Sequence, residues 1–181
     1  MISLAILMIL LWQFYIGYHR GIILQTFYVF GAILSFWLAK NYYQTLSSKI
    51  SLWIPYSNPA EGVQTAFFKE VNIFDLNKVF YAGIAFFGLF AIFYLFVRLI
   101  GIFLHFMPLN HFDDFPYHIV SGFLAVSVAL MFLSMITSIL ATVPIPIIQD
   151  QLSSHFILKA LVDHCPPMTT LIRDLWIHKI I

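Results

Sequence analysis

Hydrophobic residues dominate four long segments of the chain, and short polar segments separate them. The four segments cover about residues 2–17, 22–39, 78–106 and 119–143. A helix of roughly 20 apolar residues crosses the ~30 Å hydrocarbon core of a bilayer. Only Gly17-Tyr18-His19-Arg20-Gly21 joins the first two segments, so this part of the chain must cross a membrane, turn and return as a helical hairpin. The pattern predicts an all-α, polytopic membrane protein with four transmembrane helices.

The polar segments are themselves amphipathic. In the connection over residues 40–77, Tyr42, Leu46, Ile50 and Trp53 recur at helical spacing. This spacing fits a helix in the membrane interface that Pro55 and Pro59 end, and it fits equally a buried loop packed on the helix ends. The tail, residues 144–181, predicts two short interfacial amphipathic helices over residues 153–164 and 169–181, on either side of Pro166-Pro167. We expect one four-helix domain over residues 1–181, with both termini on the same side.

Composition supports a membrane protein and excludes several classes of soluble protein. Hydrophobic residues make up 61% of the 181 residues and charged residues only 9%, whereas soluble domains carry charge on about a quarter of their residues. A net charge of +1 argues against nucleic acid as a partner, because neutralising phosphates needs clustered Lys and Arg. The single cysteine, Cys165, excludes a disulfide framework within the chain. No basic residue precedes the first apolar segment, so we expect a retained span rather than a cleaved signal peptide.

Small residues recur at four-residue spacing in two of the expected helices. In lipid, helices associate through close backbone packing and hydrogen bonds, and small residues permit both. These stripes predict the packing faces, either within one chain or between two copies, and Gln25 can add a hydrogen bond between helices. The predicted packing and hairpin residues are Gly17, Arg20, Gly21, Gln25, Gly31, Ser35 and Ala39 in the first two helices, Arg98 in the third, and Ser121, Gly122, Ala125 and Ala129 in the fourth.

Charged residues avoid the expected spans almost completely. All eight Asp and Glu residues lie outside them, so no carboxylate is available at membrane depth to bind a coupling ion, and a cation-coupled transporter is not expected. Apart from Lys78, at the first position of the third span, Arg98 is the one charged residue within a span. It lies close enough to the helix end to reach the interface, and it could pair with Asp113 or Asp114 in the following loop.

The sequence offers few groups for catalysis or metal binding. His105, His111, His118, Asp113 and Asp114 could donate to a metal, but their spacing matches no zinc signature. No Gly-x-Ser-x-Gly turn exists to present a nucleophilic serine. Cys165 has no cationic neighbour in sequence beyond His164. We therefore expect no enzyme activity, no cofactor and no metal site.

The order of several motifs resembles the colicin V production (CvpA) family, Gram-positive type. Gly17-Tyr18-His19-Arg20-Gly21 followed by Gln25 is similar to the opening hairpin of that family, and Trp53-Ile54-Pro55-Tyr56 to its next segment. Arg98, Gly122 and the stop at Pro144 also fit, so the resemblance covers nearly the whole chain. The loop after the third span departs from it, with His and Asp where many relatives have Lys and Arg.

The resemblance implies an accessory or scaffold protein of the bacterial plasma membrane, associated with bacteriocin (toxin) production or export and with envelope homeostasis. Besides the lipid bilayer, it implies secretion or envelope membrane proteins, or a second copy of the chain, as partners. An oligomeric pore or carrier for a small or peptide-like solute is the alternative. Basic residues favour cytoplasmic termini, whereas the resemblance implies extracytoplasmic ones, which we adopt as the expectation.

Overall fold

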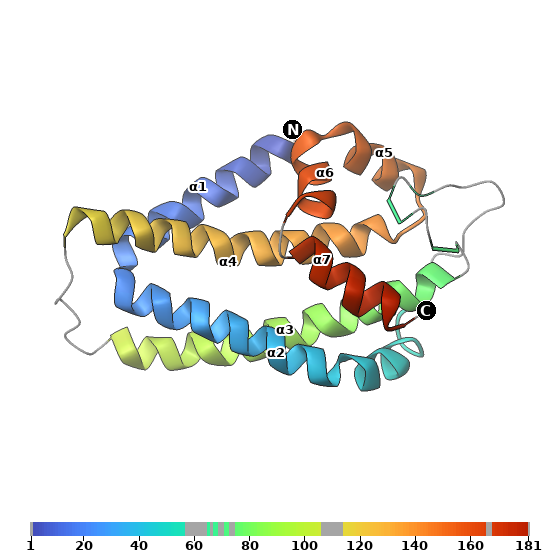
Figure 1. Cartoon of the computed structure of the whole chain (residues 1–181), viewed down its shortest axis with the longest axis horizontal. Helices are drawn as coiled ribbons and strands as arrows, with labels where there is room; N and C mark the ends of the chain where they lie inside the picture. The colour runs from blue at the N-terminus through green and yellow to red at the C-terminus, as the bar shows by residue number, and fades with distance from the viewer. Residues whose placement is uncertain are drawn as a thin grey trace. The chain divides into compact units, whose positions relative to one another are not determined.

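The computed structural model describes residues 2–56, 65, 67–68, 71–72, 75–105, 114–165 and 168–180. Four long helices account for most of them: α1 (Ile2–Arg20), α2 (Ile22–Ile50), α3 (Leu76–His105) and α4 (Phe115–Ala141) (Figure 1). All four are long and apolar enough to cross a membrane. The part of the chain that the structure describes contains no strand. The expected all-α fold with four membrane-spanning helices is therefore confirmed.

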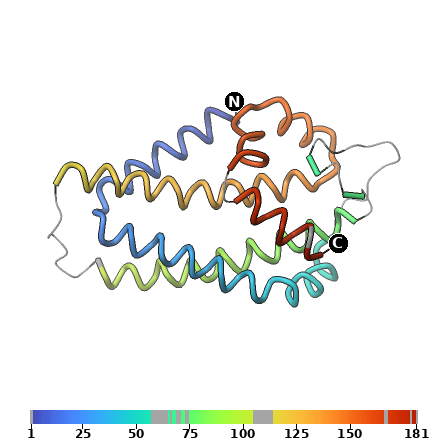
Figure 2. Tube along the Cα trace, in the orientation of Figure 1, coloured from blue at the N-terminus to red at the C-terminus, as the bar shows by residue number. Residues whose placement is uncertain are grey.

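The tail forms more short helices than the sequence predicted. They are α5 (Pro146–Ser154), α6 (Phe156–Asp163), α7 (Met168–Ile172) and a π-helix over Arg173–His178 (Figure 2). The first begins at Pro146, because proline suits the first helical position, where no amide hydrogen bond is lost. His155 has an extended backbone, with φ −105° and ψ 115°, and separates α5 from α6. The helix expected over residues 153–164 is therefore two helices, divided within its first turn.

The interfacial helix expected after the second span is the continuation of α2, which runs unbroken to Ile50. Near its end, the hydroxyls of Ser47, Ser48 and Ser51 each donate to a backbone carbonyl three residues earlier, at 2.9 to 3.0 Å. Such bonds compete with the helical pattern, which explains why the helix ends before Pro55 is reached. Further along the connection, Phe67 and Phe68 are buried. The connection thus combines features of both alternatives, a helix followed by buried loop residues.

Gly21 forms the break between α1 and α2. Its φ of +84° lies in the left-handed region, which side chains with a Cβ avoid. Nothing lies within 4 Å of a Cβ added there, so backbone conformation alone selects glycine.

Substituting Gly21→Ala is therefore expected to destabilise the hairpin by about 1 kcal/mol. Gly21→Asn should cost less, because asparagine tolerates this conformation better. Thermal unfolding of the purified variants in one detergent measures both. Equal melting temperatures for the alanine variant and the unmodified protein would contradict this account of the turn.

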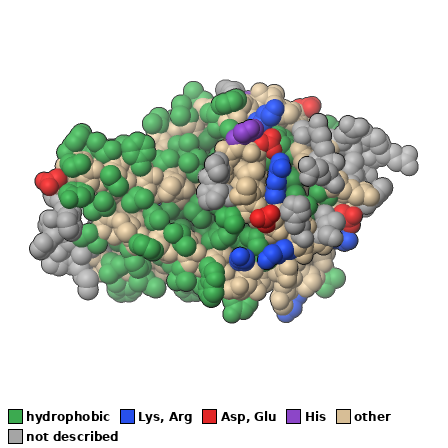
Figure 3. All heavy atoms as spheres, viewed as in Figure 1, with side chains coloured by type: hydrophobic (Ala, Val, Ile, Leu, Met, Phe, Trp, Pro, Cys, Tyr) green, Lys and Arg blue, Asp and Glu red, His purple; other side chains and the backbone are tan. Residues whose placement is uncertain are grey.

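The chain divides into two compact units. Unit 1 comprises residues 1–39 and 89–131, and unit 2 comprises residues 40–88 and 132–181. Among the described residues, unit 1 contains only three charged side chains, Arg20, Arg98 and Asp114, and all the others belong to unit 2. The face in Figure 3 shows large areas of hydrophobic side chains and few charged ones. A surface of this kind suits contact with lipid more than with water.

In unit 2, aromatic residues hold the C-terminal π-helix in place. The Trp176 side chain is fully buried, and its ring centroid lies 6.1 Å from that of Phe86. Phe86 in turn packs edge-on against Tyr43, at 5.7 Å. The Tyr43 hydroxyl donates to the carbonyl of Leu175 at 2.6 Å. Gly83 leaves room for the indole, since a Cβ there would lie 2.9 Å from Trp176 Cζ3.

Side chains of unit 2 also satisfy the C-terminal end of α4. The last carbonyls of any helix have no partner within it. The buried Gln149 amide donates to the carbonyls of Ala141 and Val143, at 3.1 and 2.8 Å. The Tyr56 hydroxyl donates to the Thr142 carbonyl at 2.7 Å. Burial, and to a smaller extent the nearby Tyr81, raises the pKa of Tyr56 to about 12. The stop before Pro144 thus leaves no exposed helix end at these three carbonyls.

We expect Gln149→Leu to lower the free energy of unfolding by about 1–3 kcal/mol, because two buried carbonyls lose their donor. Gln151→Leu is the matched control, since Gln151 is exposed on the same helix. Thermal unfolding in detergent compares the two. If both variants melt at the temperature of the unmodified protein, the Gln149 amide does not hold the end of α4.

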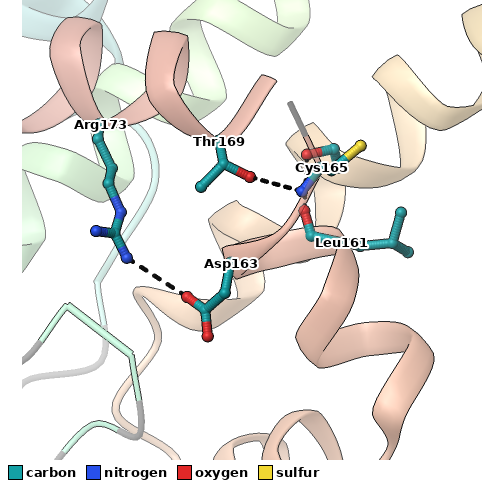
Figure 4. A network of polar contacts seen from close by, with 6 residues as sticks. Leu161, Asp163, Cys165, Thr169 and Arg173 are labelled. Atoms are coloured by element: carbon teal, nitrogen blue, oxygen red, sulfur yellow. Dashed lines mark hydrogen bonds and ion pairs between the residues drawn. The ribbon is translucent and has the colours of Figure 1, made fainter. Parts of the chain in front are cut away.

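Polar contacts connect the short tail helices (Figure 4). Arg173 Nη2 lies 3.4 Å from Asp163 Oδ1, and the Cys165 amide donates to Thr169 Oγ1 at 3.0 Å. The Ser134 hydroxyl, from α4, donates to the Leu161 carbonyl of α6 at 2.9 Å. Burial raises the pKa of the Cys165 thiol, and a hydrogen bond with Ser134 partly opposes that shift. The thiol is therefore mostly protonated at neutral pH.

Candidate functional site: the hairpin end of unit 1

Gly17 brings α1 and α4 into close contact in unit 1. A Cβ at Gly17 would lie 2.8 Å from the Ser121 carbonyl oxygen and 3.1 Å from Gly122 Cα, and it would overlap the side chain of Ala125. Gly122 makes similar room for Phe14, whose Cε2 would lie 2.6 Å from an added Cβ. Only glycine at these positions lets the helices approach this closely.

Two side chains of α4 cap the C-terminal end of α1. The Ser121 hydroxyl donates to the Gly17 carbonyl at 2.5 Å. The Nδ1–H of His118 donates to the Tyr18 carbonyl at 2.7 Å, with the two rings 5.0 Å apart. Both carbonyls lie in the last turn of α1, where helical partners are missing. Hydrogen bonds at a helix end matter more in lipid, where no water replaces them.

The second close contact in unit 1 joins α2 to α3. A Cβ at Gly31 would overlap Val97, and one at Gly101 would lie 2.5 Å from Tyr28 Cε1. Ser35 and Ala39 are buried on α2, and the Ser35 hydroxyl donates to the Gly31 carbonyl of its own helix at 2.7 Å. Ala129, the last residue of the α4 stripe, is half-buried.

Two arginines from different helices converge on one tyrosine ring beside these contacts. Arg20 Cζ lies 4.9 Å from the centroid of Tyr28, and Arg98 Cζ lies 5.2 Å from the same centroid. Arg98 is also 5.7 Å from the Tyr94 ring, and Arg20 Nη1 donates to Gln25 Oε1 at 3.3 Å. We call this group the hinge cluster: Arg20, Gln25, Tyr28, Tyr94 and Arg98.

Charge in the hinge cluster is unbalanced among the described residues. The ion pairs among the described residues are Lys78–Asp75 and Arg173–Asp163, and both lie in unit 2. Neither arginine of the hinge cluster therefore has a described carboxylate at ion-pair distance. Asp114, one of the two expected partners of Arg98, is exposed, and Asp113 lies outside the described residues. An aromatic ring attracts a cation, but only by about 0.5–2 kcal/mol, and it carries no charge.

The sequence had singled out Arg20, Gln25 and Arg98 separately, and the structure brings them together. The sequence did not single out Tyr28, Tyr94 or His118 as residues of this end of unit 1. A signal for Tyr94 was available, because a residue four positions before Arg98 lies on the same helix face. Tyr28 shares a face of α2 with Gln25 for the same reason. Nothing in the sequence indicated that α2 and α3 meet at Tyr28 and Gly101.

The histidines and aspartates that the sequence offered as metal ligands are only partly described. Within the described part of the chain, no three His, Cys, Asp or Glu side chains gather closely enough to hold a metal ion. His111 and Asp113 lie outside the described residues. His118 uses its Nδ1 to bind α1, as described above.

One comparison with known proteins gives a match. The family model described as "Colicin V production protein" matches residues 2–166 of this chain. No curated protein and no solved structure matches it. The matched region includes all four long helices, the hinge cluster and α5 and α6.

Proposed function

Because this multi-pass membrane protein belongs to the colicin V production protein family, we propose that it is an accessory or scaffold protein of the bacterial plasma membrane, acting in bacteriocin export and envelope homeostasis. The family match over residues 2–166 carries the proposal, because it ties the chain to toxin production. Helix packing in unit 1 supports it, since glycine contacts and buried hydrogen bonds are means of building a rigid scaffold.

We propose further that the protein performs no catalysis and needs no cofactor. A scaffold needs surfaces rather than reactive groups, and lipid-facing or partner-facing surfaces are abundant. Large apolar side chains of α1, among them Leu4, Leu11 and Trp12, are more than 60% exposed, so this helix has a free face. Such a face is suited to contact with lipid or with another membrane helix.

Photo-crosslinking in living cells tests the partner. A photoreactive amino acid at Leu11, 61% exposed on α1, is compared with one at Ile6, which is 5% exposed on the same helix. We expect Leu11 to give adducts with membrane proteins of secretion or the envelope, and Ile6 to give none. Deleting the gene should reduce toxin release, and the unmodified gene should restore it.

Other outcomes of this experiment would redirect the proposal. Adducts with the same chain alone, together with solute flux through liposomes containing the purified protein, would replace the scaffold by the oligomeric pore or carrier. Normal toxin release in the deletion strain, with no adduct at Leu11, would overturn the scaffold proposal altogether.

We propose that both termini face outward, and Cys165 reports on this. A membrane-impermeant maleimide reacts with thiolates. The raised pKa of Cys165 therefore predicts slow labelling at neutral pH, which accelerates as the pH rises above the pKa of an ordinary thiol. Labelling of intact cells over a pH series is therefore expected, and its rise should continue to higher pH than for Ser153→Cys in a Cys165→Ser background, because Ser153 is exposed.

A cysteine at the other end of α4 is the control. Phe115 is the first residue of α4 and is 68% exposed. Phe115→Cys in the same background should therefore be protected from the maleimide until the cells are lysed. The reverse pattern, with Phe115→Cys labelled and both tail positions protected, would show cytoplasmic termini.

A further inference from the structure

The hinge cluster contains two positive charges, and neither has a described carboxylate at ion-pair distance. Arg20 and Arg98 come from α1 and α3, and their Cζ atoms lie 4.9 and 5.2 Å from the centroid of the same Tyr28 ring. Two like charges beside one ring repel each other, and the repulsion is stronger where the surroundings have a low dielectric constant. A pair of arginines held in this way is stabilised most by an anion placed between them.

The helices fix the pair, rather than leaving two mobile side chains. Tyr28 is 5% exposed and Tyr94 is 7% exposed, so both rings that the guanidinium groups contact are part of the core of unit 1. Gly101 lets the Tyr28 ring lie directly on α3. The Gln25 side chain, only 1% exposed, orients Arg20 through its Oε1. Arg20 and Arg98 remain half-buried, so they can still be reached.

The position of the pair indicates which anions can reach it. Arg20 is the last residue of α1, and Arg98 lies six residues before the end of the apolar part of α3 at Leu104. At 1.5 Å per residue, Arg98 is about 9 Å from that end, near the depth of lipid headgroups. Guanidinium groups bind phosphate oxygens with two parallel hydrogen bonds, and basic sites between membrane helices take up anionic headgroups.

We propose that the hinge cluster is a binding site for a phosphate group, with Arg20 and Arg98 as the two ligating side chains and Tyr28 and Tyr94 as their supports. The phosphate comes either from an anionic lipid headgroup or from a soluble phosphate. This site is independent of the proposed scaffold role, because it requires only that unit 1 folds in a membrane.

The test uses the full-length protein in nanodiscs of phosphatidylcholine, with or without phosphatidylglycerol. Melting temperature and retained lipid, measured by native mass spectrometry, are the two readouts. Arg20→Gln/Arg98→Gln is compared with Lys40→Gln/Lys49→Gln, which removes the same charge from exposed positions of unit 2. A third variant, Arg20→Lys/Arg98→Lys, keeps the charge and removes the planar fork.

We expect phosphatidylglycerol to stabilise the unmodified protein and the Lys40→Gln/Lys49→Gln variant equally. The Arg20→Gln/Arg98→Gln variant should retain at least about tenfold less of this lipid, as expected for the loss of charge-assisted hydrogen bonds. The lysine variant should fall between them. Because the shift on adding lipid is compared within each variant, a lower basal stability does not obscure the result.

A separate arm identifies the source of the phosphate. Inorganic phosphate is added to phosphatidylcholine nanodiscs at constant ionic strength, with chloride as the control. Stabilisation by inorganic phosphate that requires both arginines assigns the site to a soluble phosphate, and stabilisation by phosphatidylglycerol alone assigns it to the headgroup.

Two results would overturn the site. The first is an equal response of the glutamine and unmodified proteins to both probes. The second concerns one more variant, Asp113→Asn: a response to phosphate or phosphatidylglycerol in this variant, and none in the unmodified protein, would mean that the Asp113 carboxylate already neutralises the arginines.

Discussion

Substituting Gly17→Leu is expected to separate α1 from α4 and to give one of the two largest losses of stability in this protein. A side chain at Gly17 meets a backbone carbonyl, that of Ser121, at 2.8 Å, and a backbone cannot move aside as a flexible side chain can. Overpacking of this kind costs about 1–3 kcal/mol. The bonds from Ser121 and His118 to α1 should weaken as well, at about 1 kcal/mol each.

Thermal unfolding in detergent measures this loss, and alanine variants give a matched comparison. Gly17→Ala should lower the melting temperature, although less than leucine does. Gly88→Ala should leave it unchanged or raise it slightly, because nothing lies within 4 Å of a Cβ there and alanine favours the helix. If Gly17→Ala and Gly88→Ala behave alike, α1 does not pack on α4 through Gly17.

The second large effect is expected for Trp176→Ala, at about 3–5 kcal/mol. The indole is fully buried against Phe86 and Gly83, so its removal leaves a cavity in unit 2. The Tyr43 hydroxyl bond to Leu175 depends on the same docking of the π-helix. Release of the C-terminal segment should therefore accompany the loss, and limited proteolysis of the purified protein detects it.

Two variants separate burial from other contributions of tryptophan. Trp53→Ala should change stability little, since Trp53 is 86% exposed. Trp176→Phe should lose much less than Trp176→Ala, because the buried Nε1 has no partner among the described residues and phenylalanine removes that unsatisfied donor. A tail as resistant to protease in Trp176→Ala as in the unmodified protein would contradict this interpretation of unit 2.

The sequence predicted the spans well because their physical signal is local. An apolar run of membrane length has one stable form in lipid, a helix whose backbone groups bond within the run. The hairpin turn was equally local, since Gly21 determines it through its own φ. Helix ends were predicted less well, because α2 continues past the apolar run to Ile50 and α5 begins at Pro146. Those ends depend on hydroxyl and proline effects that a hydropathy pattern does not include.

The candidate site divides in the same way. Composition and spacing marked Arg20, Gln25, Arg98 and the small residues, because a charge or a glycine within an apolar run is conspicuous by itself. Sequence could not show that Arg20 and Arg98 share one ring, or that His118 binds the end of α1. These contacts join residues from different helices, so they exist only once Gly17, Gly31 and Gly101 have let the helices approach. The sequence alone therefore determined a four-helix membrane protein, and the tertiary structure decided which of its polar groups meet, because helix packing and not chain order sets those distances.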